Sequence, residues 1–366
     1  MEKPGSRGND VVPQYCKGAV VVNEGPNFHV EVQTLPVPEI GPEDVLIKLN
    51  VTGICFSDLH YMLNDWPIPR MSELGTRCPG HEGAGTIVKV GERVKRLNVG
   101  MRAGVKPIAD TCGVCEYCRG GMEVHCEDSV MTGLHVDGTY KEYFVSPERY
   151  TTIIPDAVPD YIAAPVMCSA STMYTSLKES GLQAGQWAVF PGGGGGVGIQ
   201  GVQLAKAIGL RPVVVDTGLE KQKLALNLGA EAFVDFRESS DVAAEVVRIC
   251  DGKGAHGVFC TAPQSYPTSL SYLGKRAGGT IMCIGMPPVG ACHIDLDPTT
   301  MILQKVTIKG TMVSSQADID ATLGFAARGQ LKLQPEIVGW SGFNDACQRL
   351  RKGLVPGRIV VDFSKK

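Results

Sequence analysis

Five consecutive glycines in the second half of the chain restrict how it can fold. Gly192–Gly196 follows the short apolar stretch Trp187–Phe190 and precedes the amphipathic stretch Val197–Ile208. A strand, a glycine turn and a helix in this order form the first part of a parallel βαβ unit. Pro191 and the glycines also prevent the uncharged stretch Ser180–Ala205 from crossing a membrane as one helix.

The same alternation continues after the glycines. Short apolar stretches, expected as strands, alternate with amphipathic stretches, expected as helices, and glycines end several of the helices. The later strands and helices are expected at Pro212–Asp216, Glu220–Leu228, Ala232–Phe236, Asp241–Cys250, Gly257–Cys260, Thr280–Ile284 and Val306–Ile308. Alternation with short connections predicts an α/β fold with a doubly wound parallel sheet that carries helices on both faces.

The chain before about residue 165 consists of short strand-like runs separated by turn residues. Val45–Val51 and Gly85–Val90 are examples, and the pattern is typical of a small barrel-like β domain. Since the 366 residues exceed the roughly 100–200 of one domain, we expect two domains. A helix-like stretch at 318–328 and a strand-like end at 357–363 follow, and we expect this tail to rejoin the first domain.

The composition excludes several classes of protein. With 43% hydrophobic residues the chain can form cores, so disorder is not its main state. Its 35 Lys and Arg against 38 Asp and Glu give no basic surface for nucleic acid or for an anionic membrane. Residues 1–10 contain no apolar run of the kind that a secretory signal needs. We therefore expect a cytoplasmic protein whose 13 cysteines are thiols or metal ligands.

The glycine run contains the pattern Gly193-x-Gly195-x-x-Gly198. Five glycines meet this pattern almost automatically, but here a strand precedes it, a helix follows, and Asp216 ends the next strand about 20 residues on. Such glycines let the backbone approach a pyrophosphate at the helix N-terminus. The Asp216 carboxylate can bond a ribose 2′-OH and repels a 2′-phosphate, so the sequence favours NAD(H) over NADP(H). The alternative is a flexible glycine hinge.

Four cysteines lie within fifteen residues, in the pattern Cys112-x2-Cys115-x2-Cys118-x7-Cys126. This spacing suits a tetrahedral zinc site with four thiolates. Four protein ligands leave no position for a substrate, so such a site would have a structural role and hold a loop in place. The alternatives, buried small apolar side chains or a reactive thiol cluster, fit the spacing less well.

Three further candidate ligands are scattered along the chain. Cys55, His81 and Cys168 would supply two thiolates and one imidazole to a catalytic zinc, which keeps a fourth position open for substrate. Their spacing does not select them, because a lone buried Cys or His is usually a packing residue. On the residues alone, both interpretations stay open.

Taken together, the motifs resemble those of the zinc-dependent medium-chain alcohol dehydrogenases. The resemblance runs from about residue 15 to the end, and the first dozen residues look like an extension without a counterpart. Besides the four cysteines and the glycine loop with Asp216, the matching motifs are Gly53-x-Cys55-x-x-Asp58-Leu-His60, Asn64-Asp-Trp66-Pro67, Gly80-His-Glu-Gly-Ala-Gly85, Ala164-Pro165-x2-Cys168 and Gly357-Arg358-x-Val-Val-Asp362. The Asp-Trp-Pro stretch is most similar to the microbial (fungal) branch of tetramers.

This resemblance implies a domain division, a cofactor set and an assembly. We expect a GroES-like β-barrel catalytic domain over residues 1–168, a Rossmann domain for NAD(H) over 169–308, and a return segment over 309–366 that completes the catalytic domain. It also implies two zinc ions per chain, a small alcohol or aldehyde as substrate, and a homo-oligomer, a tetramer rather than a dimer.

The resemblance also assigns roles at the expected catalytic zinc. Cys55, His81 and Cys168 correspond to its ligands, and Glu82 to an alternative ligand. Asp58 corresponds to the carboxylate that orients the histidine.

Proton transfer and cofactor binding are implied for further residues. Ser57 corresponds to the hydroxyl that takes the proton of the alcohol, and His60 to the end of a relay that passes it to solvent while hydride goes to the nicotinamide. Cofactor contacts are implied for Gly193, Gly195, Gly196, Val197, Gly198, Asp216, Lys221, Thr172, Met286 and Arg358.

Three positions depart from the family pattern. Phe56 stands where a basic residue near the pyrophosphate is usual, so NAD(H) is expected to bind more weakly. Pro107 replaces a Trp that lines the substrate pocket in the microbial branch. With Trp66 as the remaining wall, the pocket is expected to admit substrates larger than ethanol. Met101 replaces a usual Asp and has no functional account.

The favoured interpretation is an NAD(H)-dependent zinc alcohol dehydrogenase or aldehyde reductase that acts on a primary or secondary alcohol. Pro107 motivates a variant of this interpretation, a dedicated biosynthetic reductase of one bulkier aldehyde or ketone. A polyol dehydrogenase fits less well, because the four-cysteine lobe is complete. A non-catalytic NAD-binding redox sensor is the alternative from another class. Such a sensor would have no need for Cys55, His81, Cys168 and Ser57 together.

Overall fold

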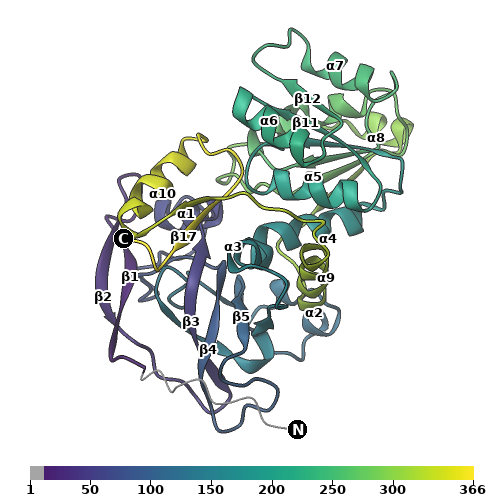
Figure 1. Ribbon diagram of the computed structural model, residues 1–366. Helices are drawn as coiled ribbons and strands as arrows, with labels where there is room; N and C mark the ends of the chain where they lie inside the picture. The colour runs from purple at the N-terminus through teal and green to yellow at the C-terminus, as the bar shows by residue number, and fades with distance from the viewer. Residues whose placement is uncertain (1–11) are drawn as a thin grey trace.

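Two lobes, each built around its own β-sheet, make up the molecule in the computed structural model, which describes residues 12–366 (Figure 1). The N-terminal extension expected from the sequence lies almost wholly outside the described residues. No helix in the described part of the chain is long and apolar enough to cross a membrane.

The lobe that follows the glycine motif contains six parallel strands in the order β12-β11-β10-β13-β14-β15. Their bounds are β10 Trp187–Pro191, β11 Arg211–Asp216, β12 Ala232–Asp235, β13 Gly257–Cys260, β14 Thr280–Cys283 and β15 Thr307–Gly310. The helices of this lobe are α5 Gly198–Ala207, α6 Leu219–Leu228, α7 Val242–Ile249, η4 Pro263–Leu273 and α8 Pro298–Gln304. This arrangement confirms the predicted doubly wound parallel sheet.

Both faces of this sheet are covered, as the near-continuous apolar strands require. Val214 belongs to one core, whereas its neighbours Val213 and Val215 belong to a second core on the opposite face. The strand order reverses at β10, between β11 and β13. In open α/β sheets, ligands bind outside the carboxyl ends of the strands at such a point, and the glycine run begins there, directly after β10.

The other lobe is organised by a seven-stranded sheet, β16-β17-β3-β4-β5-β9, with β8 paired to β3. Its strands are β3 Asp44–Gly53, β4 Gly83–Val90, β5 Arg102–Val105, β8 Tyr143–Pro147, β9 Thr152–Ile153, β16 Glu336–Val338 and β17 Ile359–Asp362. Two smaller antiparallel pairs are β1 Tyr15–Val22 with β2 His29–Pro36, and β6 Ile108–Asp110 with β7 Val130–Met131. This lobe, which the N-terminal part of the chain forms, is called the first lobe, and the parallel-sheet lobe is called the second. Because β17 pairs with β3, the end of the chain lies in the sheet of the first lobe.

A continuous helical run, Asp160–Ser180, connects the two lobes (Figure 1). It consists of α3 Asp160–Pro165, a π-helical turn η3 Val166–Ala170, and α4 Ser171–Ser180. The remaining helices are α1 Phe56–Leu63, α2 Glu116–Arg119, η1 Glu123–His125, η2 Glu148–Tyr150, α9 Gln316–Ala327, η5 Trp340–Gly342 and α10 Phe343–Arg351. One core cluster includes Val51 of β3, Met167 of the π turn and Phe190 of β10, so the connection between the lobes is packed on both sides.

Candidate active site and metal centres

The scattered ligand candidates come together beside the helical run that connects the lobes. Cys55, His81, Glu82 and Cys168 are all buried, and their ligand atoms lie within 4.8 Å of one another. Cys55 precedes α1, His81 and Glu82 directly precede β4, and Cys168 lies on the π turn η3. The pairing of β3 with β4 aligns the first two segments, and the π turn, a feature frequent at functional sites, supplies the third.

The donor set of this cluster fits a zinc ion. Two sulfurs, one imidazole and one carboxylate are ligands that Zn²⁺ prefers. Glu82 Oε1 is buried and, among the described residues, has no hydrogen-bond partner, as expected for an atom placed to face a metal. A hydrogen bond with Cys168 lowers the pKa of Cys55 well below its ordinary value, and the same contact raises the pKa of Cys168. A divalent cation would replace the proton that this sulfur pair shares.

Asp58 contacts one ring nitrogen of His81. Asp58 Oδ1 lies 2.7 Å from His81 Nδ1, which leaves Nε2 as the nitrogen available to a metal. Asp58 Oδ2 accepts hydrogen bonds from the Cys55 backbone N–H and from the Tyr140 hydroxyl, both at 2.9 Å. Asp58 is the third residue of α1, so one carboxylate both caps the helix and orients the imidazole. Burial alone lowers the pKa of His81, but Asp58 raises it well above its ordinary value.

Glu82 forms a buried ion pair with Arg358, whose guanidinium contacts Glu82 Oε2. Burial raises the pKa of Glu82 to about 7, although Arg358 acts in the opposite direction. Any Cβ on Gly53 would overlap Glu82, and any Cβ on Gly196 would overlap the Arg358 side chain. Arg358 therefore reaches from the glycine loop to the metal cluster. The resemblance implied a cofactor contact for Arg358 and an alternative zinc ligand in Glu82, without linking the two residues.

The relay candidates Ser57 and His60 lie three residues apart on α1 and so share one face of the helix. Ser57 Oγ is 3.8 Å from Cys55 Sγ, beside the metal cluster. His60 is buried, with Nδ1 at 2.6 Å from Asp65 Oδ1 and its ring stacked on Trp66 at a centroid distance of 4.3 Å. Sequence reasoning gave Asp65 no role, although it stands five residues after His60, in the Asn64-Asp-Trp66-Pro67 motif.

The glycine loop holds Asp216 at the end of β11, where the fingerprint places it. Gly194 N–H donates to Asp216 Oδ2 at 3.0 Å, and Lys221 Nζ donates to Asp216 Oδ1 at 2.9 Å. A Cβ on Gly198 would lie 2.5 Å from Gly193 Cα, so the start of α5 packs against the loop only because residue 198 is a glycine. A backbone bridge joins Gly195 to Gly357 and brings the chain before Arg358 against the loop. Val197 directly precedes α5.

The other predicted contacts fall in different environments. Thr172 is buried, and its hydroxyl donates to the Cys168 carbonyl at 2.7 Å. Met286 follows β14 and is 43% exposed. Pro107 is buried between β5 and β6, and its carbonyl accepts from Thr132 N–H at 2.8 Å. Met101 packs against the core of the first lobe, which accounts for an apolar side chain at this position.

The four-cysteine cluster has its own geometry, with all four sulfurs within 4.8 Å of one another. Cys112 Sγ lies 3.5 Å from Cys126 Sγ and 3.9 Å from Cys118 Sγ. Backbone N–H groups of Val114 and Cys115 donate to Cys112 Sγ, and these bonds lower its pKa to about 7. N–H groups that favour thiolate and four sulfurs at one point suit a closed tetrahedral zinc.

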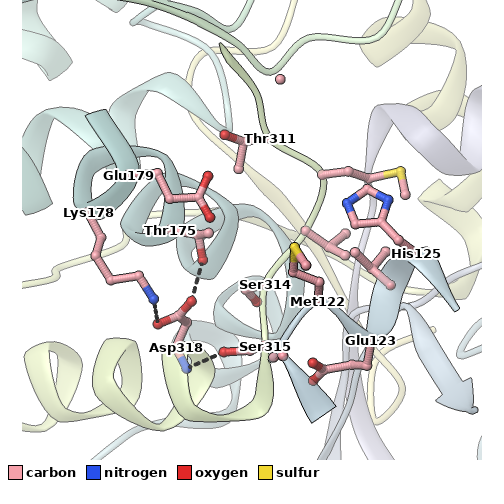
Figure 2. A pocket seen from close by; sticks show the side chains of 16 residues that line it. Met122, Glu123, His125, Thr175, Lys178, Glu179, Thr311, Ser314, Ser315 and Asp318 are labelled. Carbon is pink, nitrogen blue, oxygen red and sulfur yellow. Dashed lines mark hydrogen bonds and ion pairs between the residues drawn. The ribbon is translucent and has the colours of Figure 1, made fainter. Parts of the chain in front are cut away.

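A cavity of about 390 Å³ lies beside the loop that carries the four cysteines, between η1, α4 and the segment 310–315 (Figure 2). Asp318 accepts from Thr175 Oγ1 at 3.0 Å and from Lys178 Nζ at 2.5 Å, and its own N–H donates to Ser315 Oγ. Among the described residues that line the cavity, none belongs to either metal cluster or to the glycine loop. Lys178 and Asp318 form an ion pair with each other, and the cavity is not the candidate substrate site.

Comparison with known proteins agrees with this architecture. Residues 41–156 match the family described as "Alcohol dehydrogenase GroES-like domain", and residues 196–328 match "Zinc-binding dehydrogenase". An alcohol dehydrogenase of Schizosaccharomyces pombe is 38% identical over 357 residues, which cover 97% of this chain and 99% of that protein. Alcohol dehydrogenase 1 of Neurospora crassa is 36% identical over 358 residues, again 97% and 99% of the two chains.

A solved structure of an NAD-dependent alcohol dehydrogenase is 25% identical and superposes with a TM-score of 0.84 over 95% of this chain and 99% of its own. The two family matches together cover the larger part of the chain, and the two fungal relatives cover nearly all of it. The chain therefore belongs to the zinc-dependent medium-chain alcohol dehydrogenases, in the branch that includes the fungal enzymes.

Proposed function

We propose that this chain is an NAD(H)-dependent alcohol dehydrogenase that interconverts a primary or secondary alcohol with its aldehyde or ketone. The observation that carries the proposal is the buried cluster of Cys55, His81, Glu82 and Cys168. Arg358 links this cluster to the glycine loop, so a metal and a dinucleotide would bind side by side. A cytoplasmic protein is consistent with thiol ligands, which must stay reduced.

Each residue then has a defined task. Cys55, His81 and Cys168 would hold the catalytic zinc, with Glu82 as an alternative ligand, and the four-cysteine cluster would hold a second zinc. Zinc bound here acts as a Lewis acid on the substrate oxygen.

Proton and hydride leave the alcohol in different directions. Ser57, beside the cluster, takes the hydroxyl proton, and His60 passes it toward solvent with Asp65 as its acidic partner. NAD bound at the glycine loop would supply the acceptor for the substrate's hydride, and we place Thr172 and Met286 near its nicotinamide.

Alcohol-dependent reduction of NAD tests the proposal directly. We expect turnover by the purified protein, its loss after zinc is removed with a chelator, and its return when zinc is added back. A non-catalytic redox sensor would bind NAD(H) without turnover on any alcohol or aldehyde. Metal analysis that finds no zinc in freshly purified, active protein would refute the mechanism.

The cofactor preference rests on Asp216, which is buried at the glycine loop. A 2′-phosphate beside this carboxylate would be repelled, so we expect a strong preference for NAD(H). Asp216→Gly should relax the preference. Asp235→Asn is the matched control, because Asp235 pairs in register with Asp216 on the neighbouring strand. Equal catalytic efficiency of the wild-type enzyme with both cofactors would contradict this assignment.

A second candidate function, the reduction of one bulkier aldehyde or ketone, is favoured by Pro107. A proline is smaller than the tryptophan that the microbial branch has at this position, and each added buried methylene of a substrate contributes about 0.8 kcal/mol to binding, roughly fourfold in affinity. Catalytic efficiency should therefore rise from ethanol to branched and aromatic substrates, and Pro107→Trp should reverse the order. Efficiency that is highest for ethanol and falls with substrate size would leave an ordinary small-alcohol dehydrogenase.

The assembly we propose is a homo-oligomer, a tetramer rather than a dimer. Support for self-association is that Val289, Ile302 and Leu303, which precede the edge strand β15 in the chain, are each more than three-quarters exposed. Apolar surface of this kind commonly marks an interface. Sedimentation analysis of the wild type and of Ile302→Glu tests it, with dissociation expected for the variant.

A further inference from the structure

Tyr140 is a tyrosine in a place that a phenylalanine would fill. It is fully buried in the core of the first lobe, with its ring 4.5 Å from that of Phe343. Gly80, with φ +97°, lies against the same ring, where a Cβ would overlap it. Burial, together with the nearby Asp58 carboxylate, raises the pKa of Tyr140 well above its ordinary value, so the hydroxyl stays protonated and acts as a donor. An unpaired hydroxyl in such a core is costly, and this one is paired with Asp58.

Asp58 is itself fully buried, and its contacts come from three different segments. Oδ2 receives the Cys55 N–H and the Tyr140 hydroxyl, both at 2.9 Å, and Oδ1 faces His81 Nδ1 at 2.7 Å. A carboxylate can turn about its terminal bond, and two donors on one oxygen oppose that rotation. The Tyr140 hydroxyl therefore helps to keep the other oxygen directed at the histidine.

We propose that Tyr140 is a positioning residue for the catalytic metal, acting through Asp58 on His81. This inference rests on the proposed function only in taking the buried cluster as a zinc site. By fixing Asp58, the hydroxyl holds His81 in the tautomer and orientation that present Nε2 to the metal. Tyr140 touches neither substrate nor metal, and its contribution is the affinity and geometry of the bound ion.

Two effects of the hydroxyl oppose each other. Donation to Asp58 withdraws charge from the carboxylate, which weakens its pull on the His81 proton and would lower the affinity for metal. Fixing the carboxylate removes orientations in which His81 loses its partner, which raises the affinity. Positioning is the larger effect, because a buried carboxylate that loses a donor is poorly satisfied and adopts another arrangement.

Removal of the hydroxyl from the zinc-loaded enzyme tests which effect prevails. In Tyr140→Phe the ring packing on Phe343 is kept, and we expect zinc affinity at the buried cluster to fall about tenfold, within the range seen for outer-shell partners. Competition with a chromophoric chelator measures this, and the zinc of the four-cysteine cluster is an internal reference that should not change. Tyr150→Phe is the matched control, since its hydroxyl lies 2.6 Å from Thr111 Oγ1, beside that other cluster.

A double-mutant cycle separates positioning from general destabilisation. In an Asp58→Asn background, Tyr140→Phe should cause little further loss of zinc, because the hydroxyl acts through the carboxylate. Cobalt substituted at the buried cluster should show an altered visible spectrum in Tyr140→Phe and an unaltered one in Tyr150→Phe.

Three outcomes would overturn the inference. They are unchanged or tighter zinc binding in Tyr140→Phe, equal loosening of both zinc ions, and full additivity with Asp58→Asn. A wild-type enzyme that binds no zinc at the buried cluster would instead overturn the proposed function, so the two failures can be told apart.

Discussion

The two cysteine-containing clusters differ in where their residues come from in the chain, in their burial and in the contacts that stabilise them. The four-cysteine cluster comes from one stretch of fifteen residues at the surface, and only Cys126 in it is buried. The other cluster draws on three segments between Cys55 and Cys168, and every member is buried. Backbone N–H groups stabilise the sulfurs of the four-cysteine cluster. In the other cluster, the side chains of Asp58 and Arg358 pair with His81 and Glu82.

This difference shows what each cluster depends on. Short turns fix the sulfurs of the surface cluster, so its geometry is local and its loss should affect mainly its own loop. The buried cluster depends on the pairing of β3 with β4 and on the π turn that carries Cys168, so it exists only in the folded chain. The first is therefore expected to serve stability and the second activity.

The largest expected effect comes from Cys168→Ala in the buried cluster. Loss of one thiolate should remove the catalytic zinc and lower kcat/KM by about a thousandfold or more, since Lewis-acid stabilisation contributes several kcal/mol. The melting temperature should change little, because the side chain shrinks only slightly. Steady-state kinetics with zinc analysis check both. Cys250→Ala, at a fully buried cysteine outside both clusters, should keep wild-type activity, and comparable activity in the two variants would contradict the division of roles.

Cys115→Ser in the surface cluster should do the reverse. We expect loss of the second zinc and a stability lower by about 3 kcal/mol, roughly 5–10 °C in melting temperature, with turnover at low temperature within about threefold of wild type. Thermal unfolding with zinc counting measures this. Cys292→Ser, at another half-buried cysteine, is the control. If the Cys115 variant were stable but inactive, the surface cluster would be catalytic after all.

The same contrast explains how far the sequence alone could lead. The alternation of strands and helices and the glycine loop were predictable because each strand of the second lobe is short, apolar and bounded by turn residues. The four-cysteine site was predictable from spacing. Cys55, His81 and Cys168 were selected only by resemblance to a family. The contact of Tyr140 with Asp58 and that of Arg358 with Glu82 join residues 82 and 276 positions apart, and such contacts depend on strand register and packing that no local pattern encodes.

The two clusters also differ in how nearby buried charges are paired. Lys106 carries a buried ammonium group near the surface cluster. Its Nζ is buried without a hydrogen-bond partner among the described residues and lies 4.5 Å from the centre of the Tyr150 ring. The Tyr150 hydroxyl is 2.6 Å from Thr111 Oγ1, which lies 3.3 Å from Cys118 Sγ. The charges around the buried cluster are paired directly, whereas this one is not.

Lys106→Met is the smallest predicted effect and has a defined dependence on pH. Burial lowers the pKa of Lys106 to about 8, although Glu123 and Asp320 act in the opposite direction. Below pH 8 the amine is charged in both the folded and the unfolded chain, so the cost of burying it is fully present, and methionine should stabilise the protein by about 2 kcal/mol. As pH rises through the folded pKa, the folded chain releases a proton that the unfolded chain retains, and wild-type stability rises relative to the variant. The gain in stability from Lys106→Met should therefore shrink above pH 8.

Urea unfolding of the wild type and of Lys106→Met at pH 7 and at higher pH measures this gain. A variant less stable than wild type at pH 7 would mean that the ammonium is stabilised by the negative charge of four metal-bound thiolates, and the surface cluster would then depend on a buried charge as the catalytic one does.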